Sequence, residues 1–438
     1  MALFASLLQA CAPGGAEQTQ RASELACGTM IGHTEMRSVQ LWNQFSAVDA
    51  PAEWLIYAQS NDSLVKQVTV HPESADFNTA TTEIALLEPG VTYRGELVSA
   101  GRALDVVEFS TQPLWDYRTD PPAFKVLTGS CAYINEPAYD RPGKGYGGEY
   151  EIFETMAASD ADLMVWLGDN IYLREVDFGS YAGFGHRYGH MRATPELQGL
   201  LKSQPNVAIW DDHDFGPNDC DGSFLHKDWS QQAFESFWAN PGYGLPGEEG
   251  GITTQFRFMD VEFFLLDNRY HRVNHRNVTQ TSQILGEAQI DWLMAALSNS
   301  RAPFKVVAVG GQFLSDAAIY ENHAQFPTER EAIIRRLNEE DIRGVIFLSG
   351  DRHNGELTQL QLPNGNWVYD LTASPLTSSS YDHTDEPNTL RVEGTMIGER
   401  HFAELNFSGP RKDRELEIVM RGVAGDTIWT RTIRAQDM

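Results

Sequence analysis

The feature that most constrains the fold of this chain is a series of short, continuous apolar runs between residues 124 and 349. Six of them have the length of a strand and lie at residues 124–128, 163–167, 207–210, 263–267, 305–309 and 345–349. A strand that is apolar at consecutive positions is buried on both of its faces. The runs therefore predict a sheet that is covered on both sides.

Helical patterns lie between these runs and would supply the cover. They occupy residues 149–158, 194–203, 229–238, 286–298 and 328–339. Strands that alternate with helices are typical of layered α/β domains. Beyond residue 367 the pattern becomes rich in strands again, and we expect residues 401–407 and 414–420 to form a closing hairpin.

The first quarter of the chain has a different pattern. Between residues 27 and 112, short alternating or apolar stretches are separated by turns such as Glu88-Pro89-Gly90, which is typical of a small β-sandwich. We therefore expect three parts. These are a tail and tether at residues 1–26, an N-terminal β-sandwich of the fibronectin-III type at 27–114, and an α/β domain at 122–438.

Composition and charge exclude several classes of protein. Of the 438 residues, 42% are hydrophobic and 21% are charged, as is normal for a soluble globular protein. No stretch of 18 apolar residues occurs, so no membrane-spanning helix is expected. The 33 basic and 61 acidic residues leave a net charge of −28, which repels nucleic acids and anionic membranes. Large polyanions are therefore poor substrate candidates.

Four polar motifs come directly after buried runs. They read Gly129-Ser130-Cys131, Gly168-Asp169-Asn170-Ile171-Tyr172, Trp210-Asp211-Asp212-His213-Asp214 and Gly350-Asp351-Arg352-His353. In α/β sheets, ligands bind beyond the carboxyl ends of the strands. We therefore expect the four motifs to converge on one site.

The first two motifs carry ligands that suit iron. The carboxylate of Asp169 has two oxygens and can bridge two cations. Tyr172, three residues later, would be a hard anionic ligand as a phenolate, which suits ferric iron. Coordination to a metal would deprotonate Cys131 to a thiolate. These three residues predict one half of a metal centre.

The other two motifs carry ligands that suit harder cations. Asp351 and His353 are two residues apart and can reach a common centre, and Asp212 adds another oxygen. The three carboxylates among residues 211–214 would repel one another unless cations neutralised them. Calcium, magnesium or manganese suits such a carboxylate-rich half.

Other interpretations of single residues stay open at this point. A lone cysteine at a strand end is often packing or half of a disulfide, and Cys220 is the candidate partner of Cys131. A structural zinc-thiolate site around the same two cysteines is another alternative, although the excess of carboxylate and tyrosine argues against zinc.

The order of the four motifs resembles that of the PhoD-type alkaline phosphatases, which are relatives of the purple acid phosphatases within the metallophosphoesterases. The N-terminal β-sandwich, residues 266–272 and the helix at 285–293 are similar too, so the resemblance covers most of the chain. It implies a metallophosphoesterase-like catalytic domain of layered sheets and helices at residues 122–438. The implied cofactors are Fe3+ with one or two Ca2+, while Mg2+, Mn2+ and Zn2+ remain alternatives.

The resemblance also implies roles for residues. Asp169 matches the bridging aspartate, Tyr172 the tyrosine on ferric iron, and Cys131 the cysteine ligand. Asp212 stands where many relatives have an asparagine ligand of the second metal. Asp351 and His353 stand where the superfamily has Gly-His-x-His.

The chain departs from the family pattern at two positions. Asp214 stands where relatives often have glutamate. Near residue 309, where many relatives have a histidine ligand, this chain has Gln312. That substitution affects the ligand set of the second metal.

The expected reaction is hydrolysis of a phosphate ester, with a metal-bound hydroxide as the nucleophile. His213 would contact the phosphate or protonate the leaving oxygen. Arg352 would bind a phosphate oxygen bidentately, or pair with Asp211 or Asp214 instead.

Three further residues, Arg269, Arg272 and Asn170, are candidates for substrate contacts. Arg269 and Asn170 are the predicted substrate-binding pair, although Arg269 and Arg272 could also be structural partners of nearby carboxylates. Residues 133–150 and 178–190 are expected to shape the opening of the site.

Several functions fit such a site. The preferred one is an alkaline phosphatase that hydrolyses small phosphomonoesters, with phosphodiesterase activity as well. Phosphodiesterase, phospholipase D-like and phosphotriesterase activities are alternatives on the same metals. A catalytically inactive surface-binding protein belongs to a different class, but the filled motif positions argue against it. The oligomeric state cannot be read from the sequence.

The N-terminus bears on localisation. Residues 1–11 read MALFASLLQAC, a short apolar run that ends in a small residue and Cys11. This resembles the end of a bacterial lipoprotein signal, with Cys11 as the lipid-anchor site, although the positively charged start of a signal is missing. With the resemblance to alkaline phosphatases, it leads us to expect a periplasmic, outer-membrane-anchored or secreted protein. The alternative is a frayed chain start.

Overall fold

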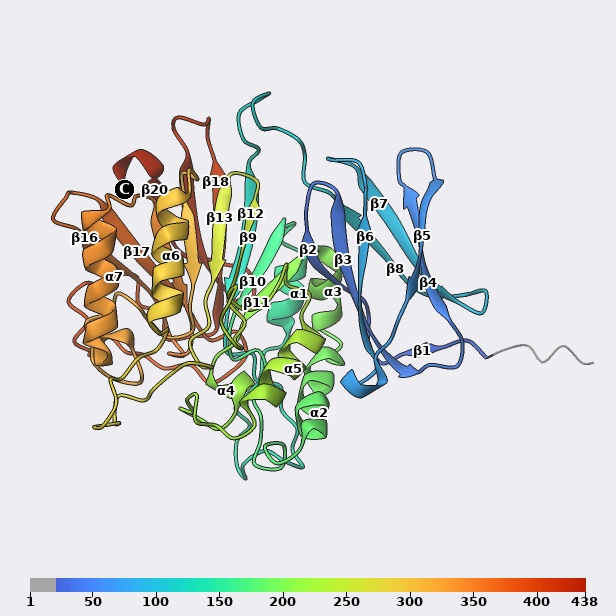
Figure 1. Cartoon of the computed structure of the whole chain (residues 1–438), viewed down its shortest axis with the longest axis horizontal. Coiled ribbons are helices and arrows are strands. Elements are labelled where there is room, and N and C mark those ends of the chain that lie inside the picture. Colours follow the sequence, from blue (N-terminus) through green and yellow to red (C-terminus); the bar gives the residue numbers. More distant parts are fainter. Residues whose placement is uncertain (1–20) are drawn as a thin grey trace, which may run out of the picture.

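The computed structural model describes residues 21–438. Cys11, the expected lipid-anchor site, lies outside these residues. Figure 1 shows a smaller all-β part beside a larger part built from two sheets with helices around them. Among the described residues, no helix is both long enough and apolar enough to cross a membrane.

The smaller part is a sandwich of two four-stranded antiparallel sheets. One contains β1 (Glu24–Leu25), β2 (Met30–Thr34), β3 (Ser38–Ala47) and β6 (Thr79–Ala85), and the other contains β4 (Ala52–Ala58), β5 (Ser63–Val70), β7 (Thr92–Ser99) and β8 (Arg102–Ser110). Leu41 and Trp54, one from each sheet, belong to the apolar cluster between them. The strands expected from the alternating sequence pattern are confirmed.

The first sheet of the larger part has six strands in the order β11-β10-β9-β18-β19-β20. Their bounds are β9 (Phe124–Gly129), β10 (Leu163–Leu167), β11 (Asn206–Ile209), β18 (His401–Ser408), β19 (Glu415–Gly422) and β20 (Thr427–Arg434). Strands β9, β10 and β11 are parallel. The expected closing hairpin is confirmed as the antiparallel pair β18 and β19.

The second sheet also has six strands, in the order β12-β13-β14-β15-β17-β16. Their bounds are β12 (Thr254–Phe258), β13 (Val261–Leu265), β14 (Lys305–Ala308), β15 (Val345–Ser349), β16 (Gly355–Gln361) and β17 (Trp367–Ala373). Strands β13, β14, β15 and β17 are parallel to one another. Its two edge strands, β12 and β16, are antiparallel to their neighbours.

The continuous apolar runs are explained by the way in which the two sheets are packed. Phe263 and Leu265 face the apolar cluster shared with the first sheet, whereas Phe264 and Leu266 face a second cluster under α6 and α7. Because side chains alternate along a strand, both faces must be apolar when both are buried. The prediction of a sheet covered on both sides is confirmed, and the α/β layered fold with it.

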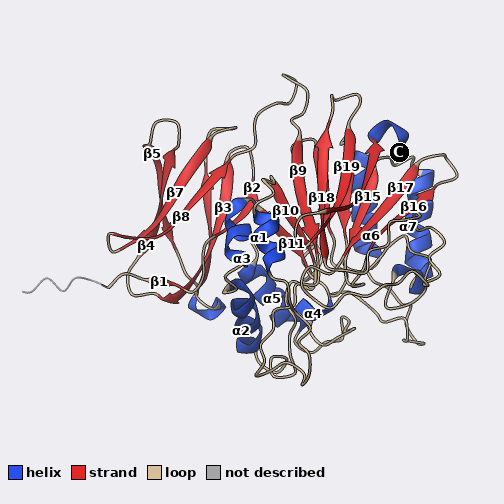
Figure 2. Cartoon of the chain, turned by 180° about the vertical axis from the view of Figure 1, so that it is seen from behind, coloured by secondary structure: helices blue, strands red, loops and turns tan. Residues whose placement is uncertain are grey.

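Seven helices accompany the sheets of the described residues. They are α1 (Glu151–Ala157), α2 (Tyr181–Arg192), α3 (Leu197–Ser203), α4 (Asp212–Phe215), α5 (Lys227–Phe237), α6 (Glu287–Asn299) and α7 (Pro327–Glu339). Helices α6 and α7 cover the second sheet, and α1, α2, α3 and α5 lie on the side of the first sheet near the sandwich (Figures 1 and 2). The expected helices are confirmed, while α2 and α4 were not predicted.

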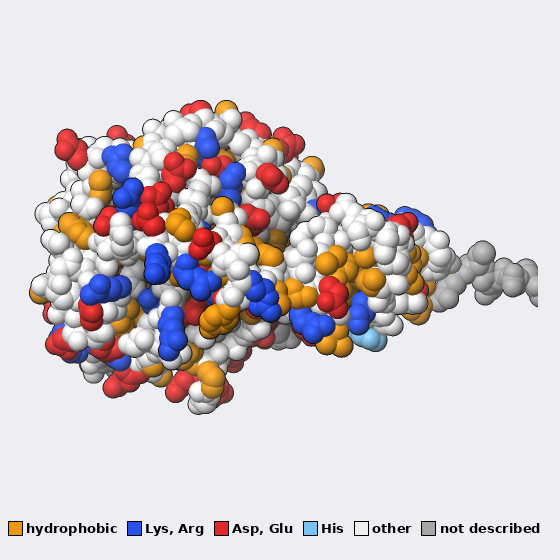
Figure 3. Space-filling view, turned by 90° about the horizontal axis from the view of Figure 1, so that it is seen from above, with side chains coloured by type: hydrophobic (Ala, Val, Ile, Leu, Met, Phe, Trp, Pro, Cys, Tyr) orange, Lys and Arg blue, Asp and Glu red, His pale blue; other side chains and the backbone are white. Residues whose placement is uncertain are grey.

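The sandwich packs directly on the larger part. The backbone N–H of His33 donates to the carbonyl oxygen of Ala239 at 2.8 Å, and the indole N–H of Trp42 donates to the carbonyl oxygen of Ser236 at 2.7 Å. Seen from above, the molecule is elongated, with the broad two-sheet part at one end and the narrower sandwich at the other (Figure 3).

Candidate metal centre

Loops gather at the carboxyl ends of the parallel strands in both sheets (Figures 1 and 2). Cys131 follows β9, Asp169 follows β10, Asp212 follows β11, and Asp351 and His353 follow β15. The backbone N–H of Cys131 donates to the carbonyl oxygen of Gly168, which ties neighbouring strand ends together. The four motifs converge, as their placement after strands predicts.

Four of the site residues have left-handed backbone conformations. The φ angles of Cys131, Asp169, Asp351 and His353 are 59°, 49°, 67° and 54°. A left-handed conformation costs a non-glycine residue about 1 kcal/mol or more of conformational energy. It persists where the surrounding structure enforces it, often at functional sites. The backbone is therefore bent sharply at each strand end, which turns these side chains toward a common centre.

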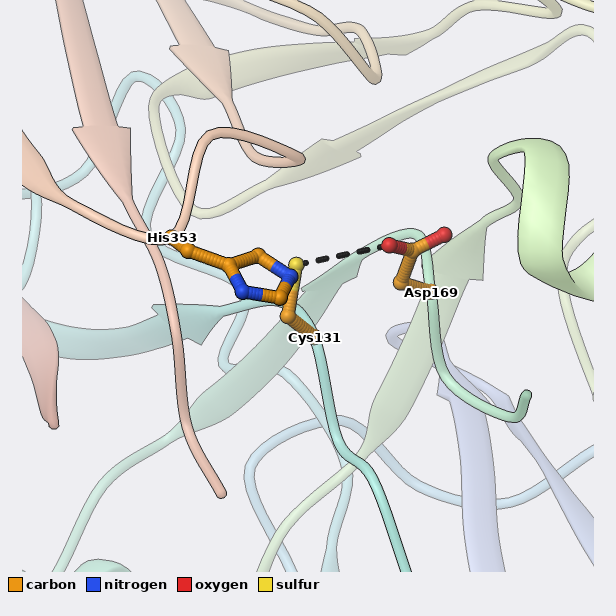
Figure 4. Close-up of side chains that lie close together, drawn as sticks. All are labelled: Cys131, Asp169 and His353. Carbon is orange, nitrogen blue, oxygen red and sulfur yellow. Dashed lines mark hydrogen bonds between the residues drawn. The ribbon is translucent and has the colours of Figure 1, made fainter. Parts of the chain in front are cut away.

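The iron-type ligands predicted from the sequence lie together. Asp169 Oδ2 is 3.4 Å from Cys131 Sγ and 3.1 Å from the Tyr172 hydroxyl. That hydroxyl is also 3.2 Å from His353 Nε2. Ligand atoms of Cys131, Asp169 and His353 all lie within 4.8 Å of one another, and Figure 4 shows the Cys131 thiol and the His353 ring side by side, facing Asp169. The spacing is right for one shared cation.

A carboxylate-rich group adjoins the first. Ligand atoms of Asp169, Asp212 and His213 lie within 4.8 Å of one another, and so do those of Asp211, Asp212 and Asp351. Asp212 Oδ1 is buried and makes no hydrogen bond, while its Oδ2 accepts the backbone N–H of Asp219 at 2.7 Å. A buried carboxylate oxygen that makes no hydrogen bond and lies beside other carboxylates fits a cation ligand. Asp169 and Asp212 are shared between groups, as a centre with more than one metal requires.

The sequence did not indicate Asp219 and Glu321, which form a third group with Asp212. The Glu321 carboxylate already pairs with Arg269 at 2.9 Å and Arg272 at 2.6 Å, so its charge is balanced by protein. The only sequence signal for Asp219 as a ligand is its position in a turn-forming segment shortly after the third motif. Glu321 lies in a loop that carries no motif.

Burial and mutual repulsion raise the pKa values of the acidic groups in this centre. Burial, with the charges of Asp211 and Asp212, raises the pKa of Asp351 to about 8. Burial also raises the pKa of Cys131 to about 12 and puts the pKa values of Asp169 and Tyr172 well above their usual range. Bound cations reverse this by favouring the ionised ligands. The donor set therefore fits metal ions.

Asp212 is the exception among these carboxyls. Burial works against its ionisation, yet His213 and Arg269 beside it hold its pKa below the usual range. Burial lowers the pKa of His213 in turn. Asp212 is thus the carboxylate that this arrangement keeps ionised most readily.

His213 lies beside Tyr172 and forms a ligand group with Asp169 and Asp212. Its ring is 4.3 Å from the ring of Tyr172, centroid to centroid, and it lines the main cavity. Its backbone N–H donates to Asp169 Oδ1 at 3.3 Å. The ring is therefore placed to contact a molecule in the cavity or to bind a cation with Asp169 and Asp212.

Arg352 also lines the cavity. The alternative that it pairs with Asp211 or Asp214 is wrong, because its ion pair is with Glu386 at 2.5 Å. A second nitrogen donates to Gln312 Oε1 at 3.1 Å. Gln312 itself donates to Glu356 and Thr372, so Gln312 is fixed in place and orients Arg352.

The predicted substrate contacts Arg269 and Asn170 are engaged elsewhere. Arg269 is buried and pairs with Asp211 at 2.5 Å as well as with Glu321. Asn170 donates from its side chain to the carbonyl oxygen of Ile209 and to Asp214. Neither is among the residues that line the cavity. The structure therefore favours structural roles for both.

The two alternatives that involved Cys220 are wrong. Cys131 and Cys220 are both free thiols in this structure. The metal-ligand group of Cys131 contains Asp169 and His353 and excludes Cys220. Cys220 Sγ lies instead 3.8 Å from the carbonyl oxygen of Asp212.

The centre opens into a cavity of about 670 Å3. The segment 133–150 shapes the opening as expected, through Tyr133, Tyr139, Arg141 and Tyr146, whereas the segment 178–190 contributes only Phe178. Most of the latter forms α2, which packs against the sandwich. There, Gly185 lies so close to the ring of Phe77 that a Cβ atom would come within 2.1 Å of it.

Comparisons with known proteins agree with this geometry. A sequence model of the PhoD-like phosphatase family matches residues 127–411. Alkaline phosphatase D of Bacillus subtilis (strain 168) is 23% identical over 255 residues, which is 47% of this chain and 43% of that protein. The chain thus aligns with less than half the length of this curated relative.

Two solved structures share the fold. A structure of PhoD matches with a TM-score of 0.78 and 17% identity, covering 94% of this chain and 90% of that one. The purple acid phosphatase PPD1 from yellow lupin (Lupinus luteus) seeds matches with a TM-score of 0.66 and 12% identity, covering 93% and 74%. Because the family match spans well over half of the chain and includes all four motifs, this protein belongs to the PhoD-like phosphatase family.

Proposed function

We propose that this protein is a metal-dependent phosphoric ester hydrolase of the alkaline phosphatase type, which hydrolyses small phosphomonoesters and also phosphodiesters. One observation carries the proposal: ligand atoms of six residues from four strand ends lie close together in overlapping groups, and four of the six residues line one cavity. These residues are Cys131, Asp169, Tyr172, Asp212, Asp351 and His353.

We propose Fe3+ for the half formed by Cys131, Tyr172, Asp169 and His353, and one or two Ca2+ for the half formed by the carboxylates. Thiolate and phenolate donors favour iron, whereas a set of carboxylate oxygens favours a hard divalent cation. When bound, such ions neutralise the phosphate charge and supply an activated nucleophile.

The protein's own residues would complete the reaction. Arg352 lines the cavity, and its guanidinium is fixed by Glu386 and Gln312, so it can hold a non-bridging phosphate oxygen with little loss of side-chain entropy. His213 would protonate or stabilise the leaving oxygen. Asp211 is held by Arg269, which keeps its charge balanced beside the site.

The test of this proposal compares a monoester with a diester of the same alcohol. Protein loaded with Fe3+ and Ca2+ is assayed with p-nitrophenyl phosphate and with bis(p-nitrophenyl) phosphate. Turnover of the monoester supports the phosphatase, and turnover of the diester alone favours the phosphodiesterase alternative. No turnover of either would favour an inactive binding protein, which the complete ligand set argues against.

Two further proposals concern the chain outside the site. We propose that the sandwich forms a separate domain, because it has its own apolar core; the domain begins at β1 (Glu24–Leu25), so the boundary expected at residue 27 is too late. We also propose export to the periplasm or the cell exterior, which rests on the sequence around Cys11 and on the likeness to alkaline phosphatase D.

A further inference from the structure

Two series of neighbouring aromatic rings extend from the metal centre along the cavity. On one side, the Tyr172 and Tyr133 ring centroids are 4.8 Å apart, and those of Tyr133 and Tyr146 are 5.6 Å apart. All three residues line the cavity. One wall of the cavity is therefore aromatic from its base to its rim.

The other series begins at His353. Its ring lies 5.9 Å from that of Tyr381, with an interplanar angle of 13°. Rings continue from Tyr381 to His383 at 6.1 Å and from His383 to Tyr320 at 6.4 Å. These four residues line the same cavity. Because the Tyr172 hydroxyl lies 3.2 Å from His353 Nε2, the two series start from adjacent groups.

The rim rings are exposed, which is costly unless something covers them. Five tyrosines are exposed among residues 21–438, and four of them line this cavity: Tyr139, Tyr146, Tyr320 and Tyr381, at 44%, 38%, 68% and 49%. Only Tyr117 lies elsewhere. Exposed aromatic side chains gathered at one opening mark a binding site for an apolar or planar group.

Tyr320 is held in place by its loop. Its φ angle of 43° and that of Glu321, 63°, both lie in the left-handed region, which is rare for large side chains. The Asn322 side chain donates to the carbonyl oxygen of Ala317 at 3.1 Å, and the Glu321 N–H donates to Gln325 Oε1 at 2.7 Å. The strained backbone thus presents an exposed ring, whose neighbours are the Arg352 guanidinium, 5.0 Å from its centroid, and the His383 ring at 6.4 Å.

The cavity is much larger than a phosphate group requires. A volume of about 670 Å3 is in the range of pockets that enclose whole small molecules, roughly 300–1,000 Å3. With the phosphate at the metal centre, the alcohol part of an ester would extend between the two series of rings. Planar rings stack on aromatic side chains irrespective of their detailed hydrogen-bonding pattern.

We propose that the preferred substrates are phosphate esters whose alcohol part carries a planar ring system, as in a nucleoside 5′-phosphate, and that Tyr320 and Tyr381 select them by stacking. This inference rests on the proposed phosphatase function. The ring-bearing alcohol can be a nucleoside or a simple aryl alcohol, because both present a planar face.

The experiment compares two monoesters with the same leaving group. Adenosine 5′-phosphate and ribose 5-phosphate both release a ribose 5′-oxygen and differ in the base. We expect kcat/KM to be at least about tenfold higher for adenosine 5′-phosphate, as base–aromatic stacking allows. A second pair, phenyl phosphate and naphthyl phosphate, releases alcohols of similar acidity and differs in ring size, and we expect the naphthyl ester to have the higher kcat/KM.

Variants of the rim tyrosines test whether their rings cause the preference for adenosine 5′-phosphate. Tyr320→Ala combined with Tyr381→Ala should bring the ratio of the two kcat/KM values close to one, mainly through KM, whereas Tyr320→Phe with Tyr381→Phe should preserve it. Tyr117→Ala, which removes an exposed tyrosine that does not line the cavity, is the control and should leave the ratio unchanged.

Two results would overturn the inference. One is an equal kcat/KM for both monoesters in the native protein, and the other is a ratio that survives the double alanine variant. Either result, with p-nitrophenyl phosphate still hydrolysed, leaves the proposed phosphatase function standing. Loss of turnover for every ester with metals present would contradict the proposed function itself.

Discussion

The hydroxyl of Tyr172 lies 3.2 Å from Nε2 of His353, although the two residues are 181 positions apart and follow strands of different sheets. The same hydroxyl lies 3.1 Å from Asp169 Oδ2. One phenol thus joins the ends of β10 and β15. The metal centre exists only because the two sheets pack with their carboxyl ends at a common edge.

Replacing a shared ligand should remove both metal and activity. We expect Asp169→Ala and His353→Ala to abolish phosphate ester turnover and to lower the metal content of the purified protein, because each residue belongs to a ligand group. Elemental analysis and turnover of p-nitrophenyl phosphate are measured on the same samples. Asp291→Asn, an exposed carboxyl on α6, is the matched control, and retention of full metal content in Asp169→Ala would contradict the assignment.

Replacing His213 should lower turnover without lowering the metal content. We expect His213→Ala to lower kcat by about 10²- to 10⁴-fold, as loss of a general acid does, while the metal content stays at the native level. Measuring both on one preparation distinguishes this role from that of a ligand. A variant that loses metal together with activity would show that His213 binds a cation with Asp169 and Asp212 instead.

Arg352 should act on phosphate binding. Arg352→Lys keeps a positive charge opposite Glu386 but loses the forked geometry. We expect kcat/KM to fall by about 10- to 100-fold, the value of a charge-assisted hydrogen bond, with native metal content. Competitive inhibition by inorganic phosphate should weaken in parallel, because Arg352 would bind it too. An unaltered inhibition constant would argue against contact between Arg352 and phosphate.

Stability should fall in acid because of a buried histidine. Burial, together with Arg272 and Arg330, lowers the pKa of His323 from its ordinary 6.5 to about 3. Between these values the unfolded chain binds more protons than the folded one, so the free energy of unfolding falls as pH falls below 6.5. His323 alone accounts for about 2 kcal/mol near pH 5, at 1.36 kcal/mol for each pH unit below 6.5.

The variant His323→Phe isolates this effect. Neither ring nitrogen of His323 has a hydrogen-bond partner, and its ring packs edge-on against Phe313 at 5.2 Å, so a phenyl ring keeps the packing. Denaturant unfolding at several pH values should show a flatter acid limb in the variant. Some acid sensitivity remains from His401, because burial lowers the pKa of that residue to about 4. Equal slopes in both proteins would contradict the assignment.

The layered fold and the convergence of the motifs were predictable because both depend on local patterns. Phe263 and Phe264 are both apolar because each faces a different core. Asp169 was identified because a polar motif follows directly after a buried strand. Such signals lie within a few residues of one another along the chain.

What could not be predicted depends on contacts between distant residues. Helix α2 contains Gly183, Gly185 and Gly189, which lower helix propensity, and it forms because Phe184 and Tyr188 are buried in the core. Arg352 has an acidic partner as anticipated, but the partner is Glu386, 34 positions later. The rim tyrosines come from three separate loops, and no local pattern marks them as neighbours.

Metal ions bound at the ends of β9, β10, β11 and β15 should carry out the proposed phosphate ester hydrolysis. The most direct test is turnover of p-nitrophenyl phosphate by protein stripped of metal with a chelator and then reloaded with Fe3+ and Ca2+. We predict no turnover in the stripped protein, recovery on reloading, and a visible charge-transfer band from iron bound to Tyr172 or Cys131. Full activity in protein shown by elemental analysis to be free of metal would contradict the claim.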